Sequence, residues 1–117
     1  MEERNRLPEC EEMVMSVLWS SKEDLDLHQV TANANAKFGK DWKIQTVATF
    51  LTRLEKKKYI SIYRVGRYSH YHPEVSKDEY RKIVLEEVVA RLFDDNKKAM
   101  AECVIGRSLT ELEDDLK

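Results

Sequence analysis

The hydrophobic residues between Trp42 and Lys58 repeat with the period of an amphipathic helix. Val47, Phe50, Leu51 and Leu54 are spaced at i, i+3, i+4 and i+7, which places them along one side of a helix. At about 100° of rotation per residue, the other side collects small polar and cationic side chains, namely Gln45, Thr46, Thr49, Thr52 and Arg53. Such groups can contact base edges and phosphates in a DNA groove. A solvated surface helix would show the same pattern, so this segment alone leaves both interpretations open.

Two further helices are predicted before this segment. The first covers Leu7–Ser20, where Pro8 and the following glutamates suit a first helical turn. The second runs from Asp26 or Leu27 to Phe38 and ends at Gly39, a typical C-cap residue. The positions expected to be buried are Leu7, Cys10, Val14, Val17, Leu18, Val30, Ala34 and Phe38. Three helices with short connections, the third of them basic, predict a helix-turn-helix.

After the third helix the pattern changes to the alternation of β-strands. Tyr59–Arg64 alternates and is rich in aromatic and β-branched residues, as strands usually are, and Tyr68–His72 is the expected returning strand. Gly66 can adopt the positive φ of a tight turn between them, and Pro73 should end the second strand. The sequence therefore predicts a β-hairpin that directly follows the third helix.

A hairpin in this place is the wing of a winged helix, expected over residues 60–72. Arg64 and Arg67 lie near its tip. They are candidates for contacts with phosphates or with an adjacent minor groove, and the alternative is that they are solvated hairpin charges.

The C-terminal part is predicted to be helical. The chain turns helical from Ser76, which as N-cap has the spacing of a capping box with Glu79; this helix includes the apolar run Tyr80–Phe93. Further helices are expected over residues 97–105 and, short and acidic, over Ser108–Leu116. These helices carry more apolar surface than one small domain can cover, which favours burial against a second copy of the chain. Folding back onto the chain's own domain is the alternative. The residues assigned to a dimer contact are Leu85, Val88, Val89, Leu92, Met100, Val104, Leu109 and Leu112.

The charge is distributed unevenly along the 117 residues. Between Lys37 and His72 there are nine cationic and two acidic side chains, a local balance of +7 in a chain whose net charge is −2. A basic middle between acidic ends is typical of a module that binds a polyanion. No apolar run approaches the roughly 20 residues that span a bilayer, and the start lacks a signal-peptide pattern. We therefore expect a cytoplasmic protein.

No catalytic motif is present, so we expect no enzymatic activity. Cys10 and Cys103 lack the spacing of a zinc site, and we expect both to be reduced and buried. His70 and His72 lie on one face of a strand and could share a metal ion, but wing histidines are more often surface residues or phosphate contacts. With three glycines, a phosphate-cradling loop is excluded, and neither a metal nor another cofactor is expected.

Three sequence blocks now carry a family resemblance. The first is Leu7–Trp19, in which Glu11, Met15 and Trp19 occupy the positions that match the family pattern. The second is Trp42-x-x-x-Thr-Val-x-Thr-Phe-Leu-x-Arg-Leu, and the third is Arg64-x-Gly-Arg followed by Tyr71-x-Pro. In this order they resemble the penicillinase-repressor family, the winged-helix repressors of β-lactamase and methicillin-resistance operons, which has a copper-responsive branch.

The resemblance implies a homodimeric transcriptional repressor that reads the two half-sites of an inverted repeat. It assigns Thr46, Thr49 and Arg53 to the DNA-contacting face, to which helix geometry adds Lys43, Gln45 and Thr52. Two-fold symmetry then predicts a palindromic operator in double-stranded DNA. A sensor or a protease that relieves repression is a further partner to expect.

The sequence departs from the family pattern in ways that leave the inducing signal open. The β-lactamase branch is cut between an asparagine and a phenylalanine, and the best-aligned position here is Cys103-Val104. The copper branch has a cysteine cluster where this chain has Cys103 alone. Lys58 stands where many relatives have a glycine, which should change only the exit of the third helix.

These observations predict a mostly α fold with a small β-hairpin. A winged helix-turn-helix for DNA binding should occupy residues 1–75, with its recognition helix at 43–57, and a helical dimerisation region residues 76–117. The predicted function is that of a homodimeric DNA-binding repressor without catalytic activity. The alternatives are a winged-helix adaptor whose basic face binds an acidic protein, and a metal-responsive regulator.

Overall fold

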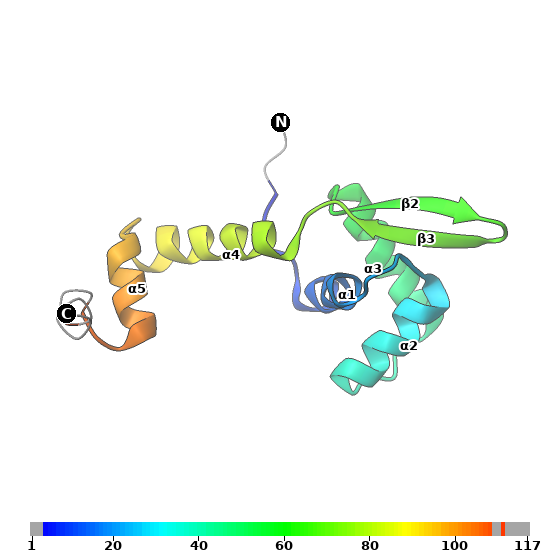
Figure 1. Ribbon diagram of the computed structural model, residues 1–117, viewed down its shortest axis with the longest axis horizontal. Helices are drawn as coiled ribbons and strands as arrows, with labels where there is room; N and C mark the ends of the chain where they lie inside the picture. Colours follow the sequence, from blue (N-terminus) through cyan, green and yellow to red (C-terminus); the bar gives the residue numbers. More distant parts are fainter. Residues whose placement is uncertain (1–3, 109–110, 112–117) are drawn as a thin grey trace. The chain divides into compact units, whose positions relative to one another are not determined.

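The computed structural model describes residues 4–108 and 111, and the chain divides into two compact units, Met1–Tyr80 and Arg81–Lys117. The elements are α1 (Glu9–Ser20), β1 (Leu25–Asp26), α2 (Leu27–Phe38), α3 (Ile44–Lys56), β2 (Ile60–Val65), β3 (Tyr68–Pro73), α4 (Lys77–Leu92) and α5 (Lys97–Ile105). Three helices and a hairpin make up most of the first unit (Figure 1). The predicted winged helix-turn-helix followed by C-terminal helices is confirmed.

The bounds of α2 follow from caps at both ends. The Asp26 side chain accepts a hydrogen bond from the Gln29 N–H, and the Gln29 side chain accepts one from the Asp26 N–H, both at 2.9 Å. This reciprocal pair is a capping box. At the other end Gly39 adopts the left-handed conformation, with φ of 61°, as the sequence predicted. The second helix therefore has nearly the predicted limits.

The sheet contains one strand more than the sequence indicated. β3 is the central strand in the antiparallel order β1-β3-β2. Tyr71 of β3 lies opposite Leu25 of β1 on one side and opposite Ile62 of β2 on the other. The two residues of β1 are too few to show an alternating pattern, which explains why the prediction stopped at a hairpin. β1 belongs to the segment between α1 and α2, and its pairing with β3 attaches this segment to the wing.

The core of the first unit lies where the three helices meet the sheet. Its largest fully buried side chains are Tyr59, Met15, Leu51, Leu54, Val14, Val30, Val47 and Val75. The predicted positions Cys10, Phe38 and Phe50 are only half-buried. Glu11 and Thr31 are buried although both are polar, because Glu11 is paired with a lysine and the Thr31 hydroxyl donates to the Leu27 carbonyl.

The first helix begins two residues later than predicted. Pro8 is the N-cap, with extended backbone angles of −56° and 153°, and the helix starts at Glu9. Leu7 is therefore outside the helix but is still buried. The predicted acidic first turn is present, with Glu9, Glu11 and Glu12 near the positive end of the helix dipole.

The second unit holds most of α4 and all of α5. The predicted capping box at the start of α4 is confirmed, since Glu79 N–H donates to the Ser76 hydroxyl at 3.0 Å and Ser76 N–H to the Glu79 carboxylate at 3.3 Å. Gly106 ends α5 in the left-handed conformation. The helix expected over 108–116 lies almost wholly outside the described residues. Within the described residues, no helix is long and apolar enough to cross a membrane.

Candidate nucleic-acid interface

α3 presents a continuous polar face to solvent. Its buried side chains are Val47, Leu51 and Leu54. Helical rotation places five predicted contact residues on the opposite side, within an arc of about 120°, namely Gln45, Thr46, Thr49, Thr52 and Arg53, and Lys43 precedes them as the N-cap. All six predicted residues are exposed: Lys43, Gln45, Thr46, Thr49, Thr52 and Arg53. The one carboxylate of the helix, Glu55, projects away from this arc. The structure thus brings the predicted residues together on one face, which we call the α3 polar face.

Two contacts fix α3 relative to α2. The Asn35 side chain accepts a hydrogen bond from the Trp42 N–H at 2.9 Å and donates one to the Trp42 carbonyl at 3.0 Å. The Trp42 ring packs edge-on against Phe50, with centroids 5.2 Å apart. Asn35 was not singled out in the sequence, because a lone asparagine near a helix end carries no signal of a partner seven residues away. Its amide closes the turn of the helix-turn-helix.

The start of α3 is open toward an anion. Lys43 is the N-cap and forms no side-chain cap, and the first turn contains no acidic residue. The N–H groups at a helix start and its dipole both favour negative charge. In α1, by contrast, three glutamates occupy this region. The α3 start therefore suits a phosphate better than the start of α1 does.

The threonines of α3 use their hydroxyl hydrogens within the helix. Thr49 donates to the Gln45 carbonyl at 3.0 Å, and Thr52 donates to the Ala48 carbonyl at 2.9 Å. Their hydroxyl oxygens remain available as acceptors, and both side chains are exposed. Such side chains suit a donor on a base edge or the methyl group of thymine.

The wing tip is a two-residue turn between Val65 and Tyr68, which pair across the hairpin. Gly66 has φ of 63°, and a positive φ at the first central position is typical of a type II′ turn. Arg64 and Arg67 are both exposed, and the Arg64 guanidinium donates to the Arg67 carbonyl at 3.2 Å. Both arginines lie at the turn end of the hairpin, which projects beyond the helices of this unit (Figure 1).

Not every cation in the basic middle of the chain is available to a ligand. The Lys57 ammonium lies 2.6 Å from the carboxylate of the buried Glu11, and Lys37 donates to the hydroxyls of Ser16 and Ser20. Lys57 holds α1 to the end of α3, and Lys37 links α2 to α1. The local charge of +7 thus overstates the charge that can reach a polyanion.

The predicted dimer residues divide into four groups. Leu85, Leu92 and Val104 are exposed, Leu92 at 71% and Val104 at 78%, while Val88 and Met100 are half-buried. Val89 is only 3% exposed, so its side chain is packed within its own chain. Leu109 and Leu112 lie outside the described residues.

The structure shows no metal centre in the part of the chain it describes, since no three His, Cys, Asp or Glu side chains cluster there. Cys10 and Cys103 are free thiols. The expectation that both are buried was wrong for Cys103, which α5 presents to solvent, and Cys10 is half-buried.

Comparison with known proteins places this geometry in a family. Residues 7–116 match the penicillinase repressor family. The fold resembles the solution structure of the DNA-binding domain of the repressor BlaI, with 25% identity and a TM-score of 0.57. It also resembles the monomeric form of Bacillus licheniformis BlaI in complex with the blaP half-operator, with 26% identity and a TM-score of 0.54. Each match covers 68% of this chain and 94% of the other.

The comparison with curated proteins gave no match. The family match nevertheless spans nearly the whole sequence, and the two structural matches cover almost all of their own chains. This chain therefore belongs to the penicillinase repressor family, a family of DNA-binding transcriptional repressors and not of enzymes.

Proposed function

We propose that this repressor binds operator DNA by placing the α3 polar face in a major groove while the wing arginines contact the neighbouring backbone. The observation that carries the proposal is that five predicted residues are exposed on one side of α3, with the exposed Lys43 at its N-cap and no carboxylate among the six. The uncapped start of α3 supports a phosphate contact. That a relative of this fold was solved with a half-operator supports the same mode of binding.

Each side chain has a separate role in this arrangement. Arg53 supplies a guanidinium that can bind a guanine edge or a phosphate, and Lys43 adds charge at the helix start. Gln45, Thr46, Thr49 and Thr52 supply short polar groups that can reach base edges. Arg64 and Arg67 contact the sugar-phosphate backbone. Such contacts fix the orientation of the winged helix on the duplex but do not read the base sequence.

Substitution of Arg53 tests this assignment. The operator duplex for the test is the sequence that wild-type protein enriches from a random pool of DNA. Arg53→Ala should weaken binding to it by about 1–3 kcal/mol and should leave the oligomeric state unchanged. Arg91→Ala is the matched control, since it removes an exposed arginine of the second unit that pairs with Glu87. Equal affinity of the Arg53 and Arg91 variants at moderate salt would contradict the role of Arg53.

We also propose that the protein acts as a homodimer, with residues 1–75 binding DNA and residues 76–117 forming the dimer contact. The exposed Leu85, Leu92 and Val104 support this role, because several large aliphatic side chains exposed in one helical region are typical of a surface that binds a partner. Two linked modules read an inverted repeat with an affinity that exceeds that of either alone. Because the proposed ligand is operator DNA, we expect the protein to act in the cytoplasm. A sensor or a protease that relieves repression is the proposed route to induction.

Leu92→Asp tests the dimer. The substitution places a charge in the proposed contact and should give monomers in sedimentation equilibrium, with loss of most operator affinity. Ala90→Asp is the control, because Ala90 is exposed and lies roughly 160° away from Leu92 around α4. A Leu92→Asp protein that stays dimeric would place the interface elsewhere.

A further inference from the structure

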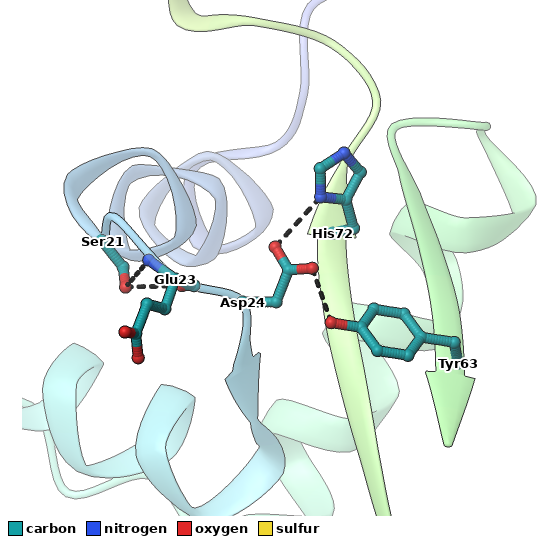
Figure 2. Close-up of polar contacts among 5 residues, drawn as sticks. All are labelled: Ser21, Glu23, Asp24, Tyr63 and His72. Atoms are coloured by element: carbon teal, nitrogen blue, oxygen red, sulfur yellow. Dashed lines mark hydrogen bonds and ion pairs between the residues drawn. The ribbon is translucent and has the colours of Figure 1, made fainter. Parts of the chain in front are cut away.

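One carboxylate joins the wing to the segment between α1 and β1. Asp24 accepts a hydrogen bond from the Tyr63 hydroxyl of β2 at 2.7 Å, and its other oxygen lies 3.0 Å from Nδ1 of His72 on β3 (Figure 2). Tyr63 and His72 are 39 and 48 residues away from Asp24 in the sequence. Asp24 is therefore in contact with both strands of the wing.

The segment that carries Asp24 is itself ordered by a local turn. The Ser21 hydroxyl donates to the Glu23 carbonyl at 2.6 Å and accepts from the Glu23 N–H at 3.2 Å (Figure 2). Immediately after Asp24 the chain enters β1, which pairs with β3 at Leu25 and Asp26. β1 contributes only two residues and, among the described strands, pairs with β3 alone, so the contact of Asp24 with Tyr63 adds a link from this segment to β2.

The strand register gathers further ionisable groups on this face of the wing. Tyr63 lies opposite His70 across the hairpin, and their rings stack with centroids 5.7 Å apart. The charged and titratable groups that act on the Asp24–His72 pair are Tyr63 on β2, His70 on β3 and Glu74 just beyond β3. His72 lies opposite the uncharged Ser61.

We propose that Asp24 is a positioning residue for the wing, and that protonation of His72 strengthens the hydrogen bond between His72 and Asp24. The wing is then held to the segment that carries Asp24 more firmly below neutral pH than above it. An imidazolium binds a carboxylate through a charge-assisted hydrogen bond, which is stronger than the bond from a neutral imidazole. The role in DNA binding rests on the proposed function, because a wing can affect affinity only if it touches DNA.

The titration of these groups agrees with the proposal. The hydrogen bond to Asp24 raises the pKa of His72; burial opposes this shift, and the carboxylates of Asp24 and Glu74 add to it. Burial opposes ionisation of Asp24, but hydrogen bonds from Tyr63 and His72 and the positive charge of His72 and His70 outweigh it and lower its pKa. Stabilisation by His72 is complete below about pH 6.5, its ordinary pKa, and is lost as the pH rises through the higher pKa of the folded state.

The first test needs no DNA. The imidazole resonances of His72 are followed against pH by NMR in the wild type, in Asp24→Asn and in Glu23→Gln, which removes a neighbouring exposed carboxylate. We expect the pKa of His72 to fall in Asp24→Asn and to change much less in Glu23→Gln. An unchanged pKa in Asp24→Asn would overturn the contact.

The second test measures affinity for the operator duplex at pH 6 and pH 8.5 at one salt concentration. Wild type should bind about two- to fivefold more tightly than Asp24→Asn at pH 6, the size expected of a partly exposed ion pair, and the ratio should approach one at pH 8.5. In a His72→Gln background the Asp24 substitution should have the same effect at both pH values, whereas in a His70→Gln background its pH dependence should persist. Thermal unfolding of each variant verifies that it is folded.

The outcomes separate the two proposals. If the ratio of the operator affinities of wild type and Asp24→Asn is the same at both pH values, the pH-dependent positioning of the wing is overturned, while operator binding is left intact. Failure of wild type to prefer its selected duplex at any pH would overturn the proposed function and the role of the wing in it. The NMR titration would still decide whether Asp24 binds His72.

Discussion

Tyr80→Phe is a sharp test of how the first turn of α4 is held to the winged helix. Tyr80 is 5% exposed, and its hydroxyl accepts a hydrogen bond from the Leu7 N–H at 2.9 Å and donates one to the Glu12 carboxylate at 2.5 Å. Its ring packs against Trp19 and Tyr59, with centroids 5.4 and 5.9 Å away. The substitution removes one oxygen and leaves the ring contacts in place.

The cost follows from the two bonds that are lost. Leu7 is buried, so its N–H has no ready access to water once the acceptor is gone, and an unpaired buried donor costs about 1–3 kcal/mol. Glu12 is half-buried, so its carboxylate can recover hydration and should lose only about 1 kcal/mol. We therefore expect Tyr80→Phe to lower the free energy of unfolding by about 2–4 kcal/mol.

Urea unfolding followed by tryptophan fluorescence measures this change. All proteins are compared at one concentration, because the stability of the proposed dimer would depend on concentration. Tyr63→Phe is the matched control: it also removes a phenolic hydroxyl that binds a carboxylate, but Tyr63 is exposed, and solvent weakens its hydrogen bond, so the loss of stability should be much smaller than in Tyr80→Phe. A Tyr80→Phe protein as stable as Tyr63→Phe would refute the reasoning.

The pH dependence provides a second check on the same residue. Burial, and then the hydrogen bond to Glu12, raise the pKa of Tyr80 above its ordinary value, and the bond from the Leu7 N–H opposes the shift only in part. The folded chain thus keeps a proton that the unfolded chain loses near pH 10. The stabilisation is full below about pH 10 and is lost as the pH rises further, so the difference between wild type and Tyr80→Phe should shrink there.

Further predictions concern the end of α3. Lys57→Met should destabilise the protein by about 1–3 kcal/mol, because it leaves the buried carboxylate of Glu11 without its cation. The control Lys56→Met, at an exposed site, should change stability by less than about 0.5 kcal/mol. Equal effects of the two substitutions in urea unfolding would show that the ion pair contributes nothing. Lys58 has φ of 64°, which costs a residue with a Cβ about 1–2 kcal/mol, so Lys58→Gly should stabilise by about 0.5–1 kcal/mol after the greater entropy loss of glycine. A lower unfolding temperature in that variant would contradict this prediction.

The parts of the fold that were predicted from sequence are those with strong local signals. α2 was placed within a residue because Gly39 marks its end and the polar Asp26 precedes its first turn. The α3 polar face was predicted residue by residue, since a regular 3.6-residue period separates the buried side of a helix from the exposed side. The start of α1 was misplaced because Pro8 fits either the N-cap or the first turn.

The parts that were missed depend on contacts between distant segments. Glu11 is buried only because Lys57 reaches it from a position 46 residues later, and nothing near Glu11 in the sequence indicates this. β1 becomes a strand only through its pairing with β3. The same holds for Asp24, whose two partners come from the wing. Helical periodicity likewise cannot tell burial within one chain from burial between two, as Val89 illustrates: it is a predicted dimer residue and is 3% exposed.

The central claim is that the α3 polar face reads DNA sequence. The most direct measurement is an equilibrium titration of the wild-type protein with its selected operator duplex and with a scrambled duplex of equal length, at several salt concentrations. We predict two chains per inverted repeat and an affinity for the operator at least about 1,000-fold above that for the scrambled duplex at physiological salt. Equal binding to both duplexes, lost at moderate salt, would contradict the claim and would point to purely electrostatic contact.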